Sequence, residues 1–226
     1  MSKKELASET PEVRNPRREG IMDAALELFG KSGLDGTSVE AIAHDAGIGK
    51  GTVYLYFRSK DEILDAILAE RWPGPHLENQ LPTMLSAERT SLVPLEEVLQ
   101  NVGNMFLGTV ERNMVVLRLA LSEAYRFPDR AERLFESTFL RANRILADFL
   151  EAQERAGRIR TLESPLVAAR CYQGMLMTYV LSQEMLGGRM YTPMDRQDWV
   201  RIAVDIFLRG MDNRTDPTSP EKRKEG

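Results

Sequence analysis

The residues best suited to chemistry lie in one short stretch, residues 46–60. It holds three basic side chains, Lys50, Arg58 and Lys60, and no acidic one, in a chain whose formal net charge is −4. Lysine and arginine bind phosphate oxygens, and clustered positive charge is typical of surfaces that bind nucleic acid. The acidic total argues mildly against such a partner, but the position of the charges matters more than their sum. The stretch therefore predicts a local positive surface that contacts phosphates.

Apolar spacing within this stretch predicts a short helix that ends near Phe57. Val53 and Phe57 lie one turn apart, so both can pack onto a preceding helix at Ile42 and Ala43. The side chains left outside this stripe are Lys50, Gly51, Tyr54 and Leu55, with Thr52 and Tyr56 at its flanks. Two tyrosines and a leucine are poor choices for a solvated face, so another molecule is expected to cover them. A helix of this kind can place its side chains on base edges in the DNA major groove.

The preceding helix is expected over residues 38–45, followed by a tight turn at residues 46–49. Thr37 and Glu40 have the spacing of a capping box, in which two side chains satisfy free backbone N–H groups at a helix start. Together, helix, turn and short helix form a helix-turn-helix over residues 37–57.

Two further helices are predicted around the helix-turn-helix. One spans 16–33, with Asn15 as its N-cap, and its apolar stripe is Ile21, Ala24, Ala25, Leu28 and Phe29. The other spans 59–72 and opens with a capping box at Ser59. Its N-terminus presents backbone N–H groups and a positive dipole end, beside Lys60, to a phosphate.

Residues 17–72 resemble the DNA-binding domain of the TetR (tetracycline-repressor) family. The run AxxAGIxKGTxYxYFxSKxE, residues 43–62, matches the signature of that family. The DNA-binding residues that the resemblance implies are Thr37, Lys50, Gly51, Thr52, Tyr54, Leu55, Tyr56 and Lys60. Residues 50–52 would face base edges, the two tyrosines would touch phosphates and thymine methyl groups, and Leu55 would assist. Thr37 and Lys60 match phosphate clamps, whereas Gly49 stands where the family commonly has Ser or Thr, so one hydroxyl contact is expected to be missing.

Beyond residue 72 the resemblance extends only to helix number and order. Three- and four-residue spacing predicts helices over 95–112, 113–126, 129–156, 165–187 and 195–211, which gives an all-α chain of about nine helices. Pro82 and Pro94 mark a predicted loop of about twenty residues after residue 72. The expected domains are a flexible arm (1–15), a helix-turn-helix domain (16–58), a connecting helix (59–72), an effector-binding and dimerisation domain (73–211) and a disordered tail (212–226). The basic residues Lys3, Lys4, Arg14, Arg17 and Arg18 reach DNA or, alternatively, form only a soluble arm.

Two segments near the C-terminus are too apolar to serve a single core. Residues 171–181 and the helix over 195–211 are apolar on nearly all sides, so each is expected to be buried on more than one face. A symmetric dimer built from these helices is therefore predicted, and the family resemblance implies the same homodimer. The expected interface residues are Gly174, Thr178, Leu181, Trp199, Ala203, Ile206 and Phe207. Two-fold symmetry suits a palindromic double-stranded DNA operator.

A mixture of Met, aromatic and polar residues lies between the two ends of the larger domain. Candidate lining residues of an effector pocket are Asn104, Met105, Leu117, Arg118, Leu121, Phe139, Asn143, Tyr172, Met175 and Tyr179, and further candidates are Met84, Phe106, Met114 and Gln173. Pockets are mostly apolar with a few polar anchors, and methionine suits adaptable surfaces. Ordinary core packing is the alternative for each of them, and the pocket itself is implied mainly by the resemblance.

The remaining residues argue against other classes of protein. There is no apolar run long enough to cross a membrane and no secretory signal, so a cytoplasmic protein is expected. The single cysteine, Cys171, is expected to be a buried structural thiol rather than a redox sensor. His44 and His76 lie far apart, so no metal site is expected, and the sequence indicates no cofactor.

The hypothesis is therefore a dimeric repressor that a small, largely apolar effector releases from DNA, with the helix over 59–72 as the lever between domains. An enzyme is one rival, but no phosphate-binding glycine loop, nucleophile elbow or paired histidine is found. The other rivals are a DNA-binding dimer without a small-molecule effector and a pure protein-interaction module.

Overall fold

The structure, a computed structural model, describes residues 15–72, 74–90, 92–129, 132 and 135–211. Every regular element in these ranges is a helix, which confirms the all-α prediction. The chain divides into two compact units, Met1–Arg71 and Trp72–Gly226. The predicted arm, apart from Asn15, and the predicted tail over 212–226 lie outside the described residues.

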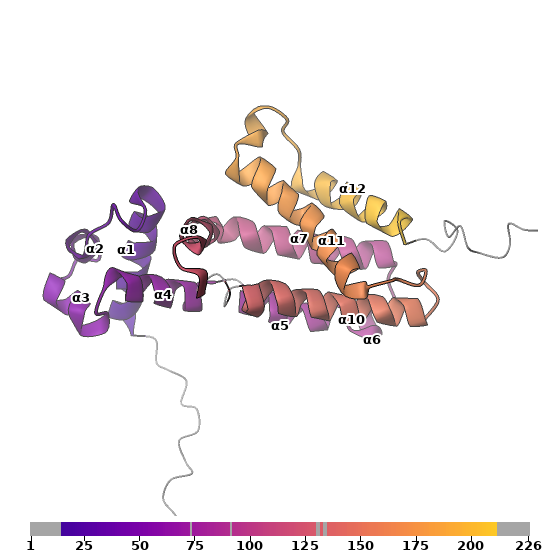
Figure 1. Cartoon of the computed structure of the whole chain (residues 1–226), viewed down its shortest axis with the longest axis horizontal. Helices are drawn as coiled ribbons and strands as arrows, with labels where there is room; N and C mark the ends of the chain where they lie inside the picture. Colours follow the sequence, from indigo (N-terminus) through magenta and orange to yellow (C-terminus); the bar gives the residue numbers. More distant parts are fainter. Residues whose placement is uncertain (1–14, 73, 91, 130–131, 133–134, 212–226) are drawn as a thin grey trace, which may run out of the picture. The chain divides into compact units, whose positions relative to one another are not determined.

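The first unit is built from α1 (Pro16–Ser32), α2 (Val39–Asp45), α3 (Lys50–Tyr56) and α4 (Lys60–Glu70), drawn in indigo and violet in Figure 1. Its innermost side chains, with no exposed surface, are Ile21, Ala25, Ile42, Ile63, Leu64 and Ile67. Val53 and Phe57 are also buried, and α3 packs against α2 as the sequence predicts. Leu28 of the predicted stripe is only half-buried, whereas its neighbour Met22 is buried.

Side chains at the helix starts fix where each helix begins. Asn15 caps α1 as expected, accepting a hydrogen bond from the Arg17 N–H at 3.1 Å. The predicted capping box at Thr37 is wrong by one residue, because Ser38 is the N-cap of α2 and accepts from the Ala41 N–H at 3.1 Å. Thr and Ser are both common N-cap residues, and the backbone conformation decides which of the two adjacent residues caps the helix.

Ion pairs tie α4 to α1 within the first unit. Arg71, directly after α4, pairs with Glu19 and, at 2.8 Å, with Asp23. The preceding residue, Glu70, accepts two hydrogen bonds from the Arg18 guanidinium, at 2.6 and 2.7 Å. A forked guanidinium on a carboxylate fixes orientation as well as distance. The end of α4 is therefore held to the start of α1.

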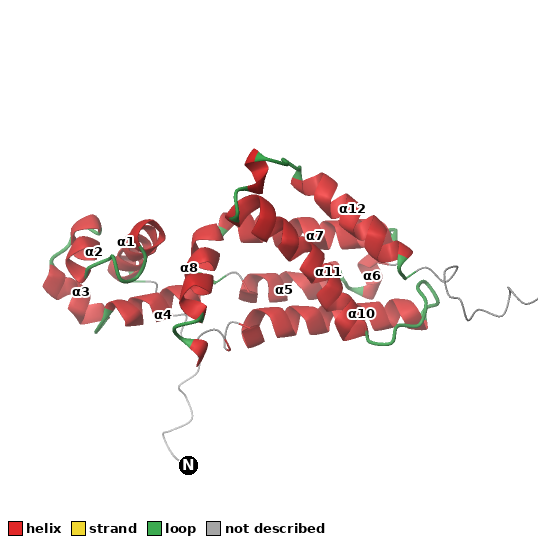
Figure 2. Cartoon of the chain, turned by 45° about the horizontal axis from the view of Figure 1, so that its top comes forward, coloured by secondary structure: helices red, strands yellow, loops and turns green. Residues whose placement is uncertain are grey.

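The second unit is a bundle. Its elements are α5 (Gly74–Met84), α6 (Ala87–Thr90), α7 (Leu95–Arg112), α8 (Met114–Ala124), the π-helix η1 (Phe135–Leu140), α10 (Arg141–Arg155), α11 (Pro165–Tyr179), the π-helix η2 (Val180–Met185), the 3₁₀-helix η3 (Gly188–Met190) and α12 (Arg196–Arg209). Five of them close a ring in which α5 contacts α10, then α11, α12 and α7 follow in turn, and α7 contacts α5 again. Figure 2 shows these five helices gathered together. Residues near the middle of that ring can therefore touch several helices at once.

The predicted loop after residue 72 is wrong, because α5 and α6 lie within it. Leu77, Leu81 and Leu85 repeat every four residues and are all buried, which places one face of α5 against the bundle. Pro82 lies in the last turn of α5 and is exposed. Burial of three leucines outweighs the backbone hydrogen bond that proline cannot donate.

Two predicted long helices contain π-helical turns. The described part of the predicted helix over 129–156 includes η1 before α10, and the predicted helix over 165–187 changes from α11 to η2 at Val180. A π-turn inserts one extra residue into the helix, so a 3.6-residue pattern alone does not reveal it.

None of the helices in the described ranges is long and apolar enough to cross a membrane.

Candidate DNA-binding surface and effector cavity

A tight turn positions α3 against α2. Gly47 in this turn has a φ of +67°, a left-handed conformation that favours glycine. The Ile48 N–H donates to the Ala43 carbonyl at 2.9 Å, which closes the end of α2. Gly49 then caps α3 without any side-chain hydrogen bond, which agrees with the missing hydroxyl predicted there. The first N–H groups of α3 are therefore available to an outside acceptor.

The outward face of α3 carries large apolar side chains in solvent. Leu55 is 81% exposed and Tyr54 is 48% exposed, although both could have been buried in a larger core. Lys50 and Gly51 are exposed beside them, and Thr52 and Tyr56 are half-buried at the flanks. A Cβ placed on Gly51 would meet no atom within 4 Å, so the surface there is open. Six of the eight predicted DNA-binding residues thus share one face.

The local charge of this face is lower than the sequence implies. Lys50 forms an ion pair with Glu40 of α2, and its ammonium lies 5.7 Å from the centre of the Tyr54 ring. The hydrogen bond between the Lys50 ammonium and the Glu40 carboxylate raises the pKa of Lys50 and lowers the pKa of Glu40. Counting charges along residues 46–60 missed this partner, because Glu40 belongs to the previous helix.

The other two predicted DNA-binding residues point into their own unit. The Thr37 side chain is buried and its hydroxyl donates to the Gly33 carbonyl at 2.8 Å. The Lys60 ammonium donates to the Leu34 carbonyl at 2.8 Å and to the Thr37 carbonyl at 3.4 Å. These contacts pin the loop between α1 and α2, so we leave both residues out of the proposed DNA-binding surface.

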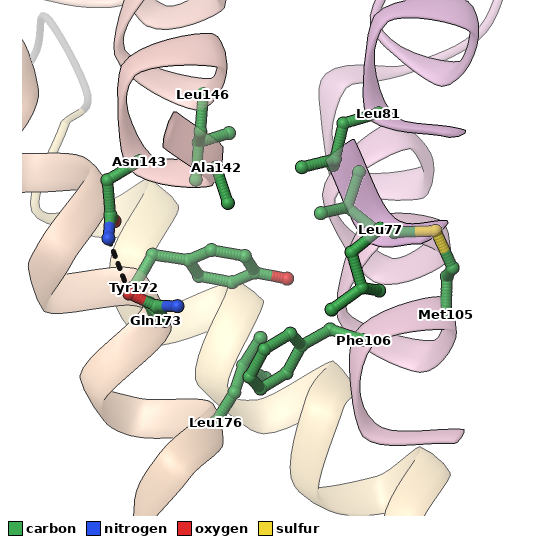
Figure 3. Close-up of a pocket in the computed structure, with 11 residues that line it drawn as sticks. Leu77, Leu81, Met105, Phe106, Ala142, Asn143, Leu146, Tyr172, Gln173 and Leu176 are labelled. Atoms are coloured by element: carbon green, nitrogen blue, oxygen red, sulfur yellow. Dashed lines mark hydrogen bonds between the residues drawn. The ribbon is translucent and has the colours of Figure 1, made fainter. Parts of the chain in front are cut away.

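An apolar cavity lies within the second unit, between α5, α7, α10 and α11. The empty space along it, counted together with open solvent at its mouth, is about 410 Å³. Figure 3 shows most of the residues that line it, which are Leu77, Leu81, Val102, Met105, Phe106, Ala142, Asn143, Leu146, Tyr172, Gln173 and Leu176. Three of the predicted pocket residues, Met105, Asn143 and Tyr172, line it, as do two of the further candidates, Phe106 and Gln173. The leucines of α5 were missed because that segment was expected to be a loop.

A smaller cavity adjoins the first through two shared walls, Leu77 and Phe106. Its remaining lining residues are Trp72, Val110, Asn113, Leu117, Phe139 and Met177, so the predicted residues Leu117 and Phe139 are found here. Leu77 and Phe106 therefore have contacts with both spaces.

Five predicted pocket residues lie elsewhere. Asn104 donates to the Gln100 carbonyl of its own helix at 3.0 Å. Leu121 is exposed, and the exposed Arg118 donates to the Glu184 carbonyl at 2.7 Å. Met175 and Tyr179 line two separate surface depressions. Each sits on a lining helix but on a face that turns away from the cavity, a distinction that helix spacing alone did not resolve.

Tyr172 forms the floor of the cavity. Its hydroxyl donates to the Leu99 carbonyl at 2.6 Å, and its ring lies 5.2 Å from the Phe207 ring. Burial raises the pKa of this phenol well above its ordinary value, so the hydroxyl stays protonated. Gly103 makes this arrangement possible, because a Cβ there would lie 2.6 Å from the Tyr172 hydroxyl oxygen.

A solvent-facing apolar groove runs between α11 and α12. Its lining residues are Met175, Thr178, Met194, Trp199, Ile202, Ala203 and Ile206. Of the predicted interface residues, Gly174, Thr178, Leu181 and Ile206 are exposed, Trp199 is half-buried, and Ala203 is buried at the bottom of the groove. Phe207 instead packs into the core against Tyr172, so it leaves the predicted interface. Cys171 is exposed, which makes the expected buried thiol wrong.

A polar cluster beside this groove was not predicted. Glu111 of α7 pairs with Arg196 at 2.7 Å and with Arg189 at 3.9 Å, and Arg189 also pairs with Glu184. The cluster joins α7 to the segment between α11 and α12. Only the folded chain brings these residues together, since Glu111 and Arg196 are far apart in sequence.

Comparison with known proteins decides the family. Residues 21–67 match the model of bacterial regulatory proteins of the tetR family, and residues 97–210 match that of the AefR-like transcriptional repressor C-terminal domain. The chain belongs to the TetR family. It is a helix-turn-helix transcriptional regulator with a C-terminal ligand-binding domain, and not an enzyme, as the motif over residues 43–62 led us to expect.

Individual TetR-family proteins are similar along most of the chain. The regulator YvkB of Bacillus subtilis is 22% identical over 87% of this chain and 97% of its own length. A solved TetR-family structure from Mesorhizobium loti is 25% identical, with a TM-score of 0.66 over 90% of this chain and all of that one. SmeT, the repressor of a multidrug efflux pump of Stenotrophomonas maltophilia, is 26% identical, with a TM-score of 0.60 over 89% of this chain and 94% of its own.

Proposed function

We propose that this TetR-family regulator is a repressor that binds a palindromic operator as a homodimer and is released by a small, largely apolar effector. The observation that carries the proposal is the combination of an exposed aromatic and apolar face on α3 with an apolar cavity in the other unit. The match to a transcriptional repressor C-terminal domain and the likeness to SmeT support repression. Action on DNA in the cytoplasm forms part of the same proposal.

For DNA, we assign the operator contacts to the outward face of α3. Gly51 and Thr52 stand at the start of the helix, where a base edge can approach closely, and Tyr54 and Leu55 extend from the next turn. Lys50 would exchange its pairing with Glu40 for a phosphate, and Arg58 is an exposed cation at the end of the helix. Phosphate contacts position the protein, and base contacts select the sequence.

For assembly, the groove between α11 and α12 supports a homodimer. Thr178, Ile202 and Ile206 leave apolar surface in solvent along two adjacent helices. A second copy placed by a two-fold axis would cover this groove with the same groove of its own. Two α3 helices would then be related by the symmetry of a palindromic operator.

For release, the effector must bind one state of the dimer better than the other. The ion pairs of Glu70 and Arg71 hold α4 to α1, so α4 is expected to move with the DNA-binding unit. The chain continues directly from α4 into Trp72, which lines the smaller cavity. We infer that a filled cavity shifts this short connection and changes the spacing of the two α3 helices.

Fluorescence anisotropy of the purified protein with DNA from upstream of its own gene tests the proposal. We expect binding that weakens steeply with salt, because counterions are released from phosphates. Tyr54→Ala should weaken specific binding at least about tenfold, as loss of a good base contact does. Tyr125→Ala, which removes a tyrosine that is 96% exposed on the other unit, is the matched control and should bind like the wild type.

The same experiment can contradict the proposal. Equal affinity for upstream and random duplexes, followed by a genome-wide DNA pull-down that recovers no enriched site, would overturn specific DNA binding. Sedimentation that shows a monomer at micromolar concentration would overturn the dimer. If the protein stays on DNA in the presence of every compound shown to occupy the cavity, effector control is overturned. The protein is then a DNA-binding dimer without an effector.

A further inference from the structure

The cavity between α5, α7, α10 and α11 has polar lining residues but no charged one among the described residues. Of the described residues that line it and the adjoining smaller space, none carries a carboxylate, an amine or a guanidinium. The Tyr172 hydroxyl is already committed to the Leu99 carbonyl, and burial keeps it neutral. An ionised ligand group would lose its hydration here without gaining a countercharge, which is strongly unfavourable.

The polar wall consists of two amides, Asn143 of α10 and Gln173 of α11, which face each other in Figure 3. Asn143 is 4% exposed. Its amide nitrogen donates to the Phe139 carbonyl at 2.6 Å and to the Gln173 side-chain oxygen at 2.5 Å. If every N–H and C=O group of the two amides had a partner, the pair would only hold two helices together. Whether the pair can bind a ligand therefore depends on which of these groups lack a partner.

The bonding pattern fixes which groups remain. A backbone carbonyl can only accept, so the Asn143 nitrogen must face Phe139 and both of its protons are used. The Gln173 oxygen must then face Asn143, which leaves the Gln173 nitrogen as a donor and the Asn143 oxygen as an acceptor. Neither of these two atoms has a hydrogen-bond partner among the described residues. Neither belongs to the polar side-chain atoms that are both fully buried and without a partner. One donor and one acceptor therefore lie side by side in an otherwise apolar wall.

We propose that this cavity takes an uncharged amphiphile, an apolar chain or ring with one end group that both donates and accepts a hydrogen bond, such as a hydroxyl or a primary amide. The end group would accept from Gln173 Nε2 and donate to Asn143 Oδ1. The apolar part would lie against Leu77, Phe106 and Leu176 and extend past Phe106 into the smaller space. This inference rests on the proposed function, since it names the chemical class of the effector.

The uncharged end group follows from comparing the possible ligands with the wall. A carboxylate has no proton to donate to Asn143 Oδ1, and an ammonium has no lone pair for Gln173 Nε2. Each would leave one buried polar group unpaired in addition to losing hydration. A pure hydrocarbon would leave both groups unpaired. Only an end group with both capacities satisfies the wall completely.

Probes with the same eight-carbon tail test the proposal. Isothermal titration calorimetry of the full-length protein at pH 7.5 would compare 1-octanol and octanamide with octanoate and octylammonium. We expect both neutral probes to bind at least about tenfold more tightly than either ion, because a buried polar group left unpaired costs roughly that much. Octanoate or octylammonium binding as tightly as the neutral probes, or no binding of the neutral probes at all, would overturn the inference.

Two variants locate the contact. Gln173→Leu removes the donor from a half-buried position, so the fold should survive, and octanamide should lose roughly five- to tenfold in affinity, as one hydrogen bond predicts. Gln100→Leu is the control, because Gln100 is also half-buried, lies on α7 and does not line either cavity. Equal loss in both variants, or none in Gln173→Leu, would contradict a contact at the amide pair.

Release of operator DNA is measured separately with the same probes. Neutral probes that bind with the expected preference but leave the protein on DNA would overturn the proposed effector control and leave the ligand class intact. Release by octanoate alone would support effector control and overturn the ligand class.

Discussion

The two units carry their sites in opposite ways. The proposed DNA-binding residues of α3 lie close together in sequence, and one of them, Leu55, is 81% exposed. The cavity residues come from four helices spread over about a hundred positions, and most are buried. In one unit the site lies on top of a core, whereas in the other the site is part of the core.

This difference determines what a substitution can do. On α3, side chains outside the core contribute little to folding, so DNA affinity can change while stability does not. Around Tyr172, each side chain supports its neighbours, so a change in the site also changes the free energy of unfolding.

Two helical glycines give the sharpest contrast. A Cβ at Gly103 would lie 2.6 Å from the Tyr172 hydroxyl oxygen and 2.9 Å from Val200 Cγ1. The Tyr172 oxygen cannot retreat without breaking its bond to Leu99, so Gly103→Ala should destabilise the protein by roughly 1–3 kcal/mol, as overpacking does. Urea unfolding followed by circular dichroism measures this loss.

Gly51→Ala is the matched control on α3, where the added methyl group meets nothing within 4 Å. Alanine is the better helix former, so the variant should be more stable by about 0.5–1 kcal/mol. Its operator affinity should nevertheless fall, because the methyl group stands where a base edge would approach. Equal stability changes at the two glycines would contradict the proposed division between the units.

The buried phenol of Tyr172 predicts a dependence of stability on pH. Its pKa is raised by burial, so above pH of about 10 the unfolded chain releases this proton while the folded chain keeps it. The folded state then binds more protons, and stability should fall by up to about 1.4 kcal/mol for each pH unit above that value. Below it, Tyr172 contributes no pH dependence.

Tyr172→Phe isolates this effect. The variant should lose about 1 kcal/mol at pH 8, through the missing bond to the Leu99 carbonyl. The variant should also lack the part of the decrease in stability at alkaline pH that Tyr172 causes. The free energies of unfolding of the two proteins should therefore converge between pH 10 and 11. Tyr125→Phe, at a position 96% exposed, should follow the wild type throughout. Parallel curves for the wild type and Tyr172→Phe would show that the phenol ionises freely in the folded protein.

The sequence predicted the first unit well because its information is local. The apolar spacing placed Val53 and Phe57 inside and Tyr54 and Leu55 outside, and the resemblance over residues 43–62 supplied the family. It did not reveal that the polar groups of Thr37 and Lys60 satisfy backbone carbonyls of the loop after α1. A hydroxyl or an ammonium can bind a phosphate or a carbonyl equally well, and sequence alone does not distinguish them.

The second unit was harder because its site depends on packing between distant helices. Met105, Asn143 and Tyr172 were found, since residue type alone suggested them. Leu77 and Leu81 were missed because two prolines made their segment look like a loop. Asn104 and Tyr179 lie on helices that line the cavity but on faces that turn away from it, and helix spacing alone did not show which face meets the cavity.

The smallest change in affinity is expected at Glu40 of α2, whose carboxylate pairs with Lys50 of α3. Its ion pair with Lys50 holds that cation away from an incoming phosphate. Glu40→Gln removes the negative charge but keeps the length and shape of the side chain, so Lys50 can turn to DNA without breaking a salt bridge. Operator affinity at low salt should rise about two- to fivefold, as one freed phosphate contact predicts, and the gain should fade at high salt.

A control variant distinguishes the loss of the charge beside Lys50 from the loss of any negative charge on the same unit. Glu27→Gln removes a carboxylate from an equally exposed ion pair with Lys31 on α1, within the same unit but away from α3, and should change operator affinity little. Because Glu40 lies on the surface, neither variant should alter the free energy of unfolding noticeably. If Glu40→Gln weakened binding instead, the ion pair would be holding Lys50 in its DNA-binding position, and the pairing would then belong to the site rather than compete with it.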